Sequence, residues 1–215
     1  GSGQARCIFQ LMLLPTNLIP TAALVLAAGN SSRLGQPKQL LIYQGETLLH
    51  RAVRTALAAG CAPVIVVTGA LDVVLRQAMA DLPCQAVHST DWAAGMGASI
   101  RAGLACLAAG PAVLVMSCDQ PLVKAEALQQ LIHQQQASGA PAAAATYAGT
   151  FGIPAVFAPA AVADLRGLRP EQGAKPLLAS YGPALTLVPI PDAAFDVDTP
   201  AAYAALLARP DGGPA

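Results

Sequence analysis

The chain has 215 residues, of which 54% are hydrophobic and only 11% charged, and twelve basic residues balance twelve acidic ones. A neutral chain without a basic stripe gives no support for a nucleic-acid partner. No apolar run reaches the roughly 18 residues that a membrane-spanning helix needs. We therefore expect a soluble protein with a single domain at residues 22–208, between a leader with a tag remnant at 1–21 and a tail at 209–215.

The five cysteines form no C-x-x-C pair, and several lie inside apolar runs, as buried and reduced thiols do. This usage is typical of a reducing compartment, so we expect a cytoplasmic protein. The histidines His50, His88 and His133 are scattered along the chain without the spacing of metal ligands. We do not expect them to be catalytic.

The first predicted element is a buried strand at residues 24–28, which ends at Gly29 in a polar loop. Gly29 and Gly35 can both adopt positive φ, which lets backbone N–H groups turn inward. The loop also carries Arg33 and Lys38, and both side chains suit phosphate oxygens. It therefore predicts a polyphosphate pocket, although its spacing differs from that of a P-loop. A surface turn with solvated charges stays open on loop chemistry alone.

Strands and helices alternate after this loop. We expect an extended piece at 40–43 and a helix capped by Thr47 at 47–59. Further strands are predicted at 64–67, 85–88 and 112–116, and each is followed by a helix, at 72–80, 99–108 and 124–136 respectively. The alternation predicts a doubly wound α/β fold. Ligands in such sheets bind beyond the carboxyl ends of the strands. Because Gly29, Gly69 and Asp119 each follow a predicted strand, we expect them to share one site.

The final third is less regular, with predicted strands at 142–146, 152–157 and 185–189, helices near Ala161 and Lys175, and a last helix at 201–208. The chemistry of three aspartates is open at this point. Asp119 could cap the helix at 124, and Asp196 or Asp198 could cap the last helix. Alternatively, a carboxylate at a strand end can be compensated by a bound metal ion.

The loop reads L-A-A-G-x-S-x-R-x-G-x-P-K and resembles the signature of the MobA-like nucleotidyltransferases, most closely the molybdenum cofactor cytidylyltransferases. Four further segments are similar to family motifs. They are C-D-x-P at 118–121, D-x-D-T-P at 196–200, W-x-x-G-M-G-x-S-I at 92–100 and G-x-P-x-x-F at 152–157. The resemblance covers residues 24–207. It implies a Rossmann-like, mostly parallel sheet with helices on both faces, of the nucleotide-diphospho-sugar transferase type.

The resemblance also implies roles for individual residues. Arg33, Lys38 and Asp119 would be catalytic, and Asp119 and Asp198 would bind Mg²⁺. The nucleotide-binding residues would be Leu26, Ala27, Ala28, Gly29, Arg33, Lys38, Gly69, Ser99 and Asp119, with Trp92 as a packing residue. The acceptor side would include Gly152, Pro154, Gly173 and Lys175. Around Gly173 the chain reads P-E-Q-G-A-K, where relatives often carry G-D-x-G-A-R.

The reaction that this resemblance implies is transfer of CMP from CTP to the terminal phosphate of molybdopterin, with release of pyrophosphate. A molybdenum hydroxylase would receive the product. CTP is favoured over GTP because the loop reads L-A-A-G, whereas guanylyltransferase relatives typically read L-A-G-G. Two alternatives stay open: a sugar-phosphate or polyol-phosphate nucleotidyltransferase, and a non-catalytic carrier that inserts the molybdenum cofactor into an enzyme.

Overall fold

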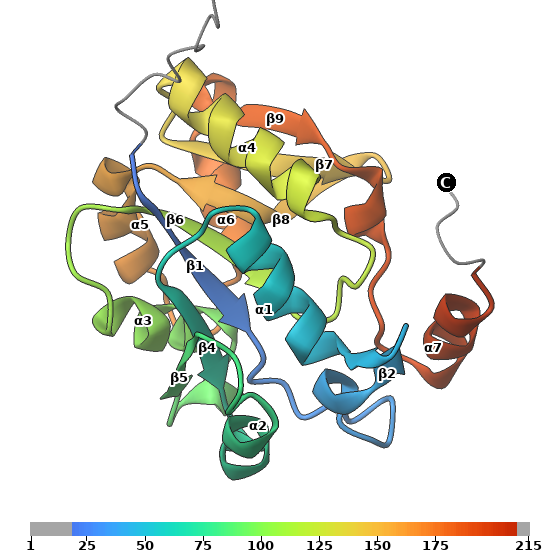
Figure 1. Cartoon of the computed structure of the whole chain (residues 1–215). Helices are drawn as coiled ribbons and strands as arrows, with labels where there is room; N and C mark the ends of the chain where they lie inside the picture. Colours follow the sequence, from blue (N-terminus) through green and yellow to red (C-terminus); the bar gives the residue numbers. More distant parts are fainter. Residues whose placement is uncertain (1–18, 210–215) are drawn as a thin grey trace, which may run out of the picture.

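The computed structural model describes residues 19–209 and is built on a seven-stranded sheet of order β5-β4-β1-β6-β8-β7-β9 (Figure 1). Only β8 runs antiparallel to its neighbours; every other pair in this sheet is parallel. The mostly parallel α/β sheet expected from the sequence is confirmed. Its strands are β1 (Thr21–Leu26), β4 (Val64–Thr68), β5 (Gln85–His88), β6 (Ala112–Ser117), β7 (Ala142–Tyr147), β8 (Thr150–Phe157) and β9 (Thr186–Pro189).

Helices cover both faces of the sheet (Figure 1). Along β1, Ala23 and Val25 face one apolar cluster, whereas Ala22 and Leu24 face the other. Successive side chains of a strand point to opposite faces, so a strand buried on both sides is apolar throughout. The first face is covered by α1 (Leu48–Ala58), α2 (Asp72–Ala78) and α4 (Ala125–Ser138), and the second by α3 (Met96–Ala105), α5 (Val162–Arg166) and α6 (Ala174–Ser180).

Several boundaries differ from those expected. Strand β1 begins at Thr21, inside the expected leader, whose residues 1–18 lie outside the described part of the chain. Helix α3 begins at Met96 rather than at residue 99, because Gly95, with φ of 135°, ends the preceding turn and serves as its N-cap. The predicted cap of α1 is confirmed, since the Thr47 hydroxyl accepts the His50 N–H at 3.0 Å.

Of the expected extended piece at 40–43, Leu40 ends a short 3-10 turn, Lys38–Leu40, whereas Leu41 is extended and Ile42–Tyr43 form the strand β2. Strand β2 pairs with β3 (Glu46–Thr47) in a separate hairpin. The hairpin packs against α7 (Pro200–Leu207) in a small apolar cluster that contains Leu34, Leu41, Tyr43, Leu48, Val197 and Leu206. This cluster brings the loop after β1 and the segment before α7 to the same end of the sheet. Within residues 19–209, no helix is long and apolar enough to cross a membrane.

Candidate active site

A cavity of about 530 Å³ opens at the carboxyl ends of β1 and β6. Its volume lies in the range of small-molecule sites, and its place is the one expected for a doubly wound sheet. It is lined by the predicted residues Leu26, Ala27, Ala28, Gly29, Lys38, Ser99 and Asp119. The fold therefore gathers residues from the loop after β1, the start of α3 and the end of β6 around one space.

Two of the predicted nucleotide-binding residues do not line the cavity. Arg33 lies outside its lining, with 71% of its side chain exposed. Gly69 lies behind the wall: a Cβ atom there would be 2.4 Å from the carbonyl oxygen of Ala28 and 2.7 Å from Cγ of Trp92. Trp92 itself lines the cavity. Gly69 therefore allows the close packing that holds Trp92 in the wall.

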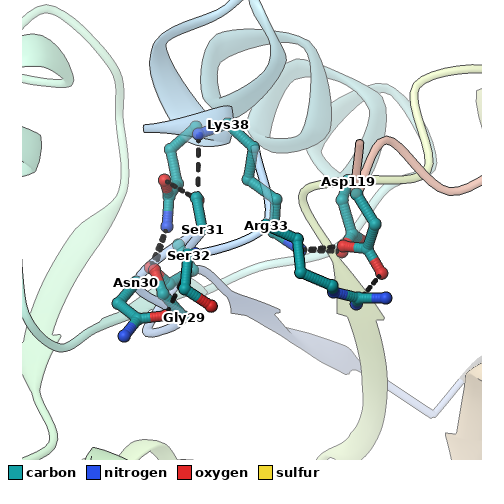
Figure 2. Close-up of polar contacts among 10 residues, drawn as sticks. Gly29, Asn30, Ser31, Ser32, Arg33, Lys38 and Asp119 are labelled. Carbon is teal, nitrogen blue, oxygen red and sulfur yellow. Dashed lines mark hydrogen bonds and ion pairs between the residues drawn. The ribbon is translucent and has the colours of Figure 1, made fainter. Parts of the chain in front are cut away.

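The two loop cations meet two aspartates from distant parts of the chain (Figure 2). The ammonium group of Lys38 donates to Asp119 and, at 2.8 Å, to Oδ1 of Asp198. Arg33 donates to Oδ2 of Asp198 at 2.7 Å. Lys38 and Asp119 are 15% and 13% exposed, so their attraction is screened by water far less than that of Arg33 and Asp198. Lys38 is the electrostatic centre of the cluster.

The pKa values in this cluster follow from its charges. Burial lowers the pKa of Lys38, but the charge of Asp119 and hydrogen bonds to both aspartates outweigh it, so the net shift is upward. The hydrogen bond from Lys38 lowers the pKa of Asp198. Asp196 is exposed, yet partial desolvation and then the charges of Asp119 and Asp198 raise its pKa to about 6. The lysine is thus held charged among carboxylates.

Neither helix that could have been capped by these aspartates is capped by them. Lys124 occupies the N-cap of α4 and makes no side-chain capping bond. The cap of α7 is Thr199, whose hydroxyl accepts the Ala202 N–H at 3.1 Å. Asp119 and Asp198 therefore act through the ion-pair cluster. Within the described residues, no group of three or more His, Cys, Asp or Glu side chains is arranged as a metal centre.

The loop after β1 presents backbone donors to the cavity. Gly35 has a positive φ of 74°, whereas Gly29 does not use this freedom: Ser31 adopts the left-handed conformation instead, with φ of 55°. Within residues 19–209, the N–H groups of residues 28–31 donate to no protein acceptor. Ala28, Gly29 and Asn30 line the cavity. Unpaired N–H groups next to Lys38 form a concave surface that suits an anion.

The predicted acceptor residues lie outside the cavity lining, although Gly173 lies next to one of its residues. Gly173 is the N-cap of α6, and a Cβ atom there would lie 3.6 Å from the sulfur of Met96, a cavity residue. Lys175 donates to Thr150 Oγ1 at 2.6 Å, and its ammonium lies 5.9 Å from the ring centre of Phe151. The structure therefore engages Lys175 within the protein, beside β8.

Gln120 connects β8 to the carboxylate cluster. Its side-chain amide donates to the carbonyl of Ile153, next to Pro154 of β8, at 3.3 Å, and to that of Ala193 at 2.9 Å. The carbonyl of the neighbouring Asp119 accepts the Val197 N–H at 2.9 Å. These bonds join the end of β6, the predicted acceptor strand and the segment of Asp198. Within this network, Gly152 and Pro154 lie in β8 near the site without lining its cavity.

The thiols provide a test of this packing. Cys61 and Cys118 are buried, Cys84 is partly exposed and Cys106 is exposed; Cys7 lies outside the described residues. Burial raises the pKa of both Cys61 and Cys118 to about 12, with the charge of Asp119 adding to the shift at Cys118.

We expect iodoacetamide at pH 8 to label Cys106 in the folded protein and to spare Cys61 and Cys118, because the reactive form is the thiolate. Peptide mapping by mass spectrometry measures the labelled fraction, and the same treatment in guanidinium should label all three. Labelling of Cys118 in the folded protein at the rate of Cys106 would contradict the packing around the site.

Comparison with known proteins places these features in a family. The model of the MobA-like NTP transferase domain matches residues 23–185. Over 108 residues, 49% of this chain and 52% of the relative, the chain is 41% identical to nicotine blue oxidoreductase of Paenarthrobacter nicotinovorans. The chain is also 35% identical to a probable molybdenum cofactor guanylyltransferase of Opitutus terrae, over 111 residues that make up 51% of this chain and 52% of the relative. The chain thus spans about half the length of these two curated relatives.

A solved structure is also similar over most of its length. The crystal structure of Rv0371c from Mycobacterium tuberculosis H37Rv has a TM-score of 0.77 and 30% sequence identity, covering 89% of this chain and 99% of that one. A second structure of Rv0371c is a complex with manganese. It has a TM-score of 0.73 and 28% sequence identity, and the match covers 87% of this chain and 98% of that one. Together with the family model, these similarities show that the chain belongs to the MobA-like NTP transferase family.

Proposed function

We propose that this protein is a molybdenum cofactor cytidylyltransferase, which transfers CMP from CTP to the terminal phosphate of molybdopterin and releases pyrophosphate. One observation carries the proposal: unpaired loop N–H groups, Lys38 and Asp119 surround a single cavity of nucleotide size. A carrier of the finished cofactor needs no such polyphosphate site. The enzyme would act in the cytoplasm and pass its product to a molybdenum hydroxylase.

The cavity is lined by both charged and apolar residues, which suggests how the nucleotide lies in it. The triphosphate would bind next to Lys38 and Asp119, with Arg33 nearby. Ala27, Ala28 and Trp92 belong to the apolar wall, where the nucleoside would lie. Arg33 is mostly exposed, and its pair with Asp198 is worth about 0–1 kcal/mol. It can therefore exchange that partner for a phosphate at little cost.

The carboxylates suit a divalent cation of the kind that prefers oxygen ligands. Asp119 and Asp198 both contact the ammonium group of Lys38, and Mg²⁺ commonly takes one or two carboxylates together with water and substrate phosphates. The manganese complex of the similar Rv0371c supports a divalent metal in this family. When bound by Asp119 and Asp198, Mg²⁺ would neutralise charge on the phosphates.

The reaction needs no nucleophile from the protein. An oxygen of the acceptor phosphate, which is already ionised, attacks the α-phosphorus of CTP. A new P–O bond forms, the bond between the α-phosphorus and its bridging oxygen breaks, and pyrophosphate leaves with the electron pair. In such a reaction catalysis consists of alignment and charge stabilisation. Lys38 and the loop N–H groups would hold the phosphates in place, and Lys38 and Arg33 would stabilise the charge that develops on them.

The choice of CTP and molybdopterin is supported by resemblance. The loop reads L-A-A-G, with Ala28 where guanylyltransferases typically have glycine, and this favours a cytosine base. The Opitutus relative carries the name of a molybdenum cofactor enzyme, which supports a pterin acceptor. That name also mentions guanylyl transfer, so the assay must compare bases.

The test is pyrophosphate release by the purified chain with Mg²⁺ and molybdopterin, with CTP, GTP and ATP supplied in parallel. We expect release with CTP and little with the other two. Release with GTP alone would contradict the base assignment, and release only with a sugar phosphate or polyol phosphate would contradict the acceptor. Tight binding of molybdenum cofactor, with no turnover of any combination of nucleotide and acceptor, would favour a carrier.

A further inference from the structure

The side chain of Gln39 occupies a place that neither the motif nor the reaction explains. Gln39 is fully buried, borders the cavity and directly follows Lys38 in the short turn after the loop. Its Nε2 donates to the carbonyl of Ala27 at 2.9 Å and to that of Gly29 at 2.8 Å. Buried amides are normally satisfied by nearby polar groups, and here those groups belong to the loop itself. Gln39 therefore ties the end of the loop to its beginning.

Ser31 completes this connection at the middle of the loop. Its hydroxyl accepts the Lys38 N–H at 3.0 Å and lies 3.5 Å from Oε1 of Gln39, to which it donates. Ser31 also has a φ of 55°. A residue other than glycine keeps this left-handed conformation only where its surroundings hold it. The bonds through Ser31 and Gln39 supply such surroundings.

These bonds engage carbonyl groups of the loop and none of the N–H groups of residues 28–31. The carbonyls of Ala27 and Gly29 are engaged by Gln39, whereas the N–H groups of residues 28–31 have no acceptor within the described chain. A binding site for an anion needs N–H groups pointing inward and carbonyl oxygens turned away. The same bonds fix the backbone of Lys38, whose ammonium is the charged centre of the site.

We propose that Gln39 is a positioning residue for the triphosphate, which keeps the loop in its anion-binding conformation without contacting a phosphate. This inference rests on the proposed function, because it requires that the cavity binds a nucleoside triphosphate. Its effect should be larger on the phosphates than on the nucleoside, because the nucleoside would also contact Trp92 and Ser99, which come from other elements. Gln39→Met keeps the size of the side chain and removes both donors.

Gln135 offers a matched control. It is also a buried glutamine, 2% exposed, and its Nε2 donates to the carbonyl of Ala140 at 2.8 Å, at the end of α4 away from the cavity. The experiment measures dissociation constants of CTP, inorganic tripolyphosphate and cytidine, with Mg²⁺ present, for the wild type, Gln39→Met and Gln135→Met. Calorimetry serves for the two polyphosphates and an NMR titration for cytidine.

We expect Gln39→Met to weaken CTP and tripolyphosphate about tenfold, or about 1.4 kcal/mol, and to change cytidine binding less than twofold. Gln135→Met should leave all three constants unchanged. Equal affinities of wild type and Gln39→Met for tripolyphosphate, or an equal loss for tripolyphosphate and cytidine, would overturn the positioning role while the proposed function stands. If the wild type binds neither CTP nor tripolyphosphate, the proposed function fails, and this inference with it.

A second variant keeps the test decisive if Gln39→Met does not fold. Ser31→Gly removes the hydroxyl that holds the Lys38 N–H, while glycine adopts the φ of 55° without strain. We expect tripolyphosphate affinity to fall severalfold in this variant with cytidine affinity unchanged. Unchanged tripolyphosphate affinity in both Ser31→Gly and Gln39→Leu would overturn the inference, because the loop would then hold its conformation without the bonds through Ser31 and without the two donors of Gln39.

Discussion

Replacing Lys38 by alanine should lower nucleotidyl transfer by at least about a hundredfold to a thousandfold. Loss of one group that stabilises a developing charge typically has this effect. The ammonium of Lys38 contacts both Asp119 and Asp198, and Lys38 lines the cavity. Pyrophosphate release under saturating CTP and molybdopterin measures the loss.

The same variant should also affect the protein without substrate. Removing the lysine leaves Asp119, which is 13% exposed, next to Asp198 without its ammonium partner. The free energy of unfolding should fall by about 2 kcal/mol, between the values for exposed and for buried pairs. Mg²⁺ should then raise the melting temperature of Lys38→Ala more than that of the wild type, because the cation can replace the lost charge.

Two further variants separate charge from geometry. Lys38→Arg keeps the charge but replaces a compact ammonium by a planar fork, so stability should recover more than activity. Lys124→Ala removes an exposed lysine at the N-cap of α4 and should behave as wild type. Turnover and CTP affinity at wild-type levels in Lys38→Ala would show that the phosphate site lies elsewhere.

The sheet could be predicted from the sequence because local signals and burial agree there. Strands such as Val64–Thr68 and Ala112–Ser117 are buried on both faces and therefore appear as continuous apolar runs. Thr47 marks the start of α1 by local chemistry alone. Because parallel strands end at one edge, their order in the chain was enough to bring Gly29 and Asp119 to one site.

The internal connections of the site could not be predicted in this way, because they depend on contacts between distant parts of the chain. Lys38 and Asp119 are 81 residues apart, and Lys38 and Asp198 are 160 apart. No local pattern distinguishes a carboxylate that pairs with a lysine from one that caps a helix. The role of Gln39 had a weaker signal still, namely one amide directly after the motif lysine, in a short turn for which the sequence predicted no element.

The left-handed conformation of Ser31 could not be predicted for a related reason. Glycine adopts positive φ at no steric cost, so Gly29 was the natural candidate. In the structure Ser31 has this conformation, and its hydroxyl bonds to the Lys38 N–H across seven residues. Side-chain bonds within the folded loop thus outweigh the intrinsic preference of the backbone.

Asp119→Asn should abolish metal-dependent turnover, with a loss of about a thousandfold or more, while the protein stays folded. The substitution keeps the shape of the side chain but removes a carboxylate that would bind Mg²⁺. Folding should survive because Lys38 keeps its bond to Asp198 at 2.8 Å. Circular dichroism and the melting temperature check the fold, and pyrophosphate release over a range of Mg²⁺ concentrations checks the activity.

Comparison with Asp198→Asn makes this prediction sharper. Asp198 is 34% exposed and also pairs with Arg33, whereas Asp119 is 13% exposed and lines the cavity. Neutralising a buried carboxylate removes more of its attraction for a cation than neutralising an exposed one, because less water screens that attraction. We therefore expect Asp119→Asn to be the more severe variant, and higher Mg²⁺ to restore more activity in Asp198→Asn. Asp192→Asn, on the turn before that segment, is the control. Undiminished turnover in Asp119→Asn would remove Asp119 from the site, and equal losses in Asp192→Asn would assign the effect to the surface charge of the segment.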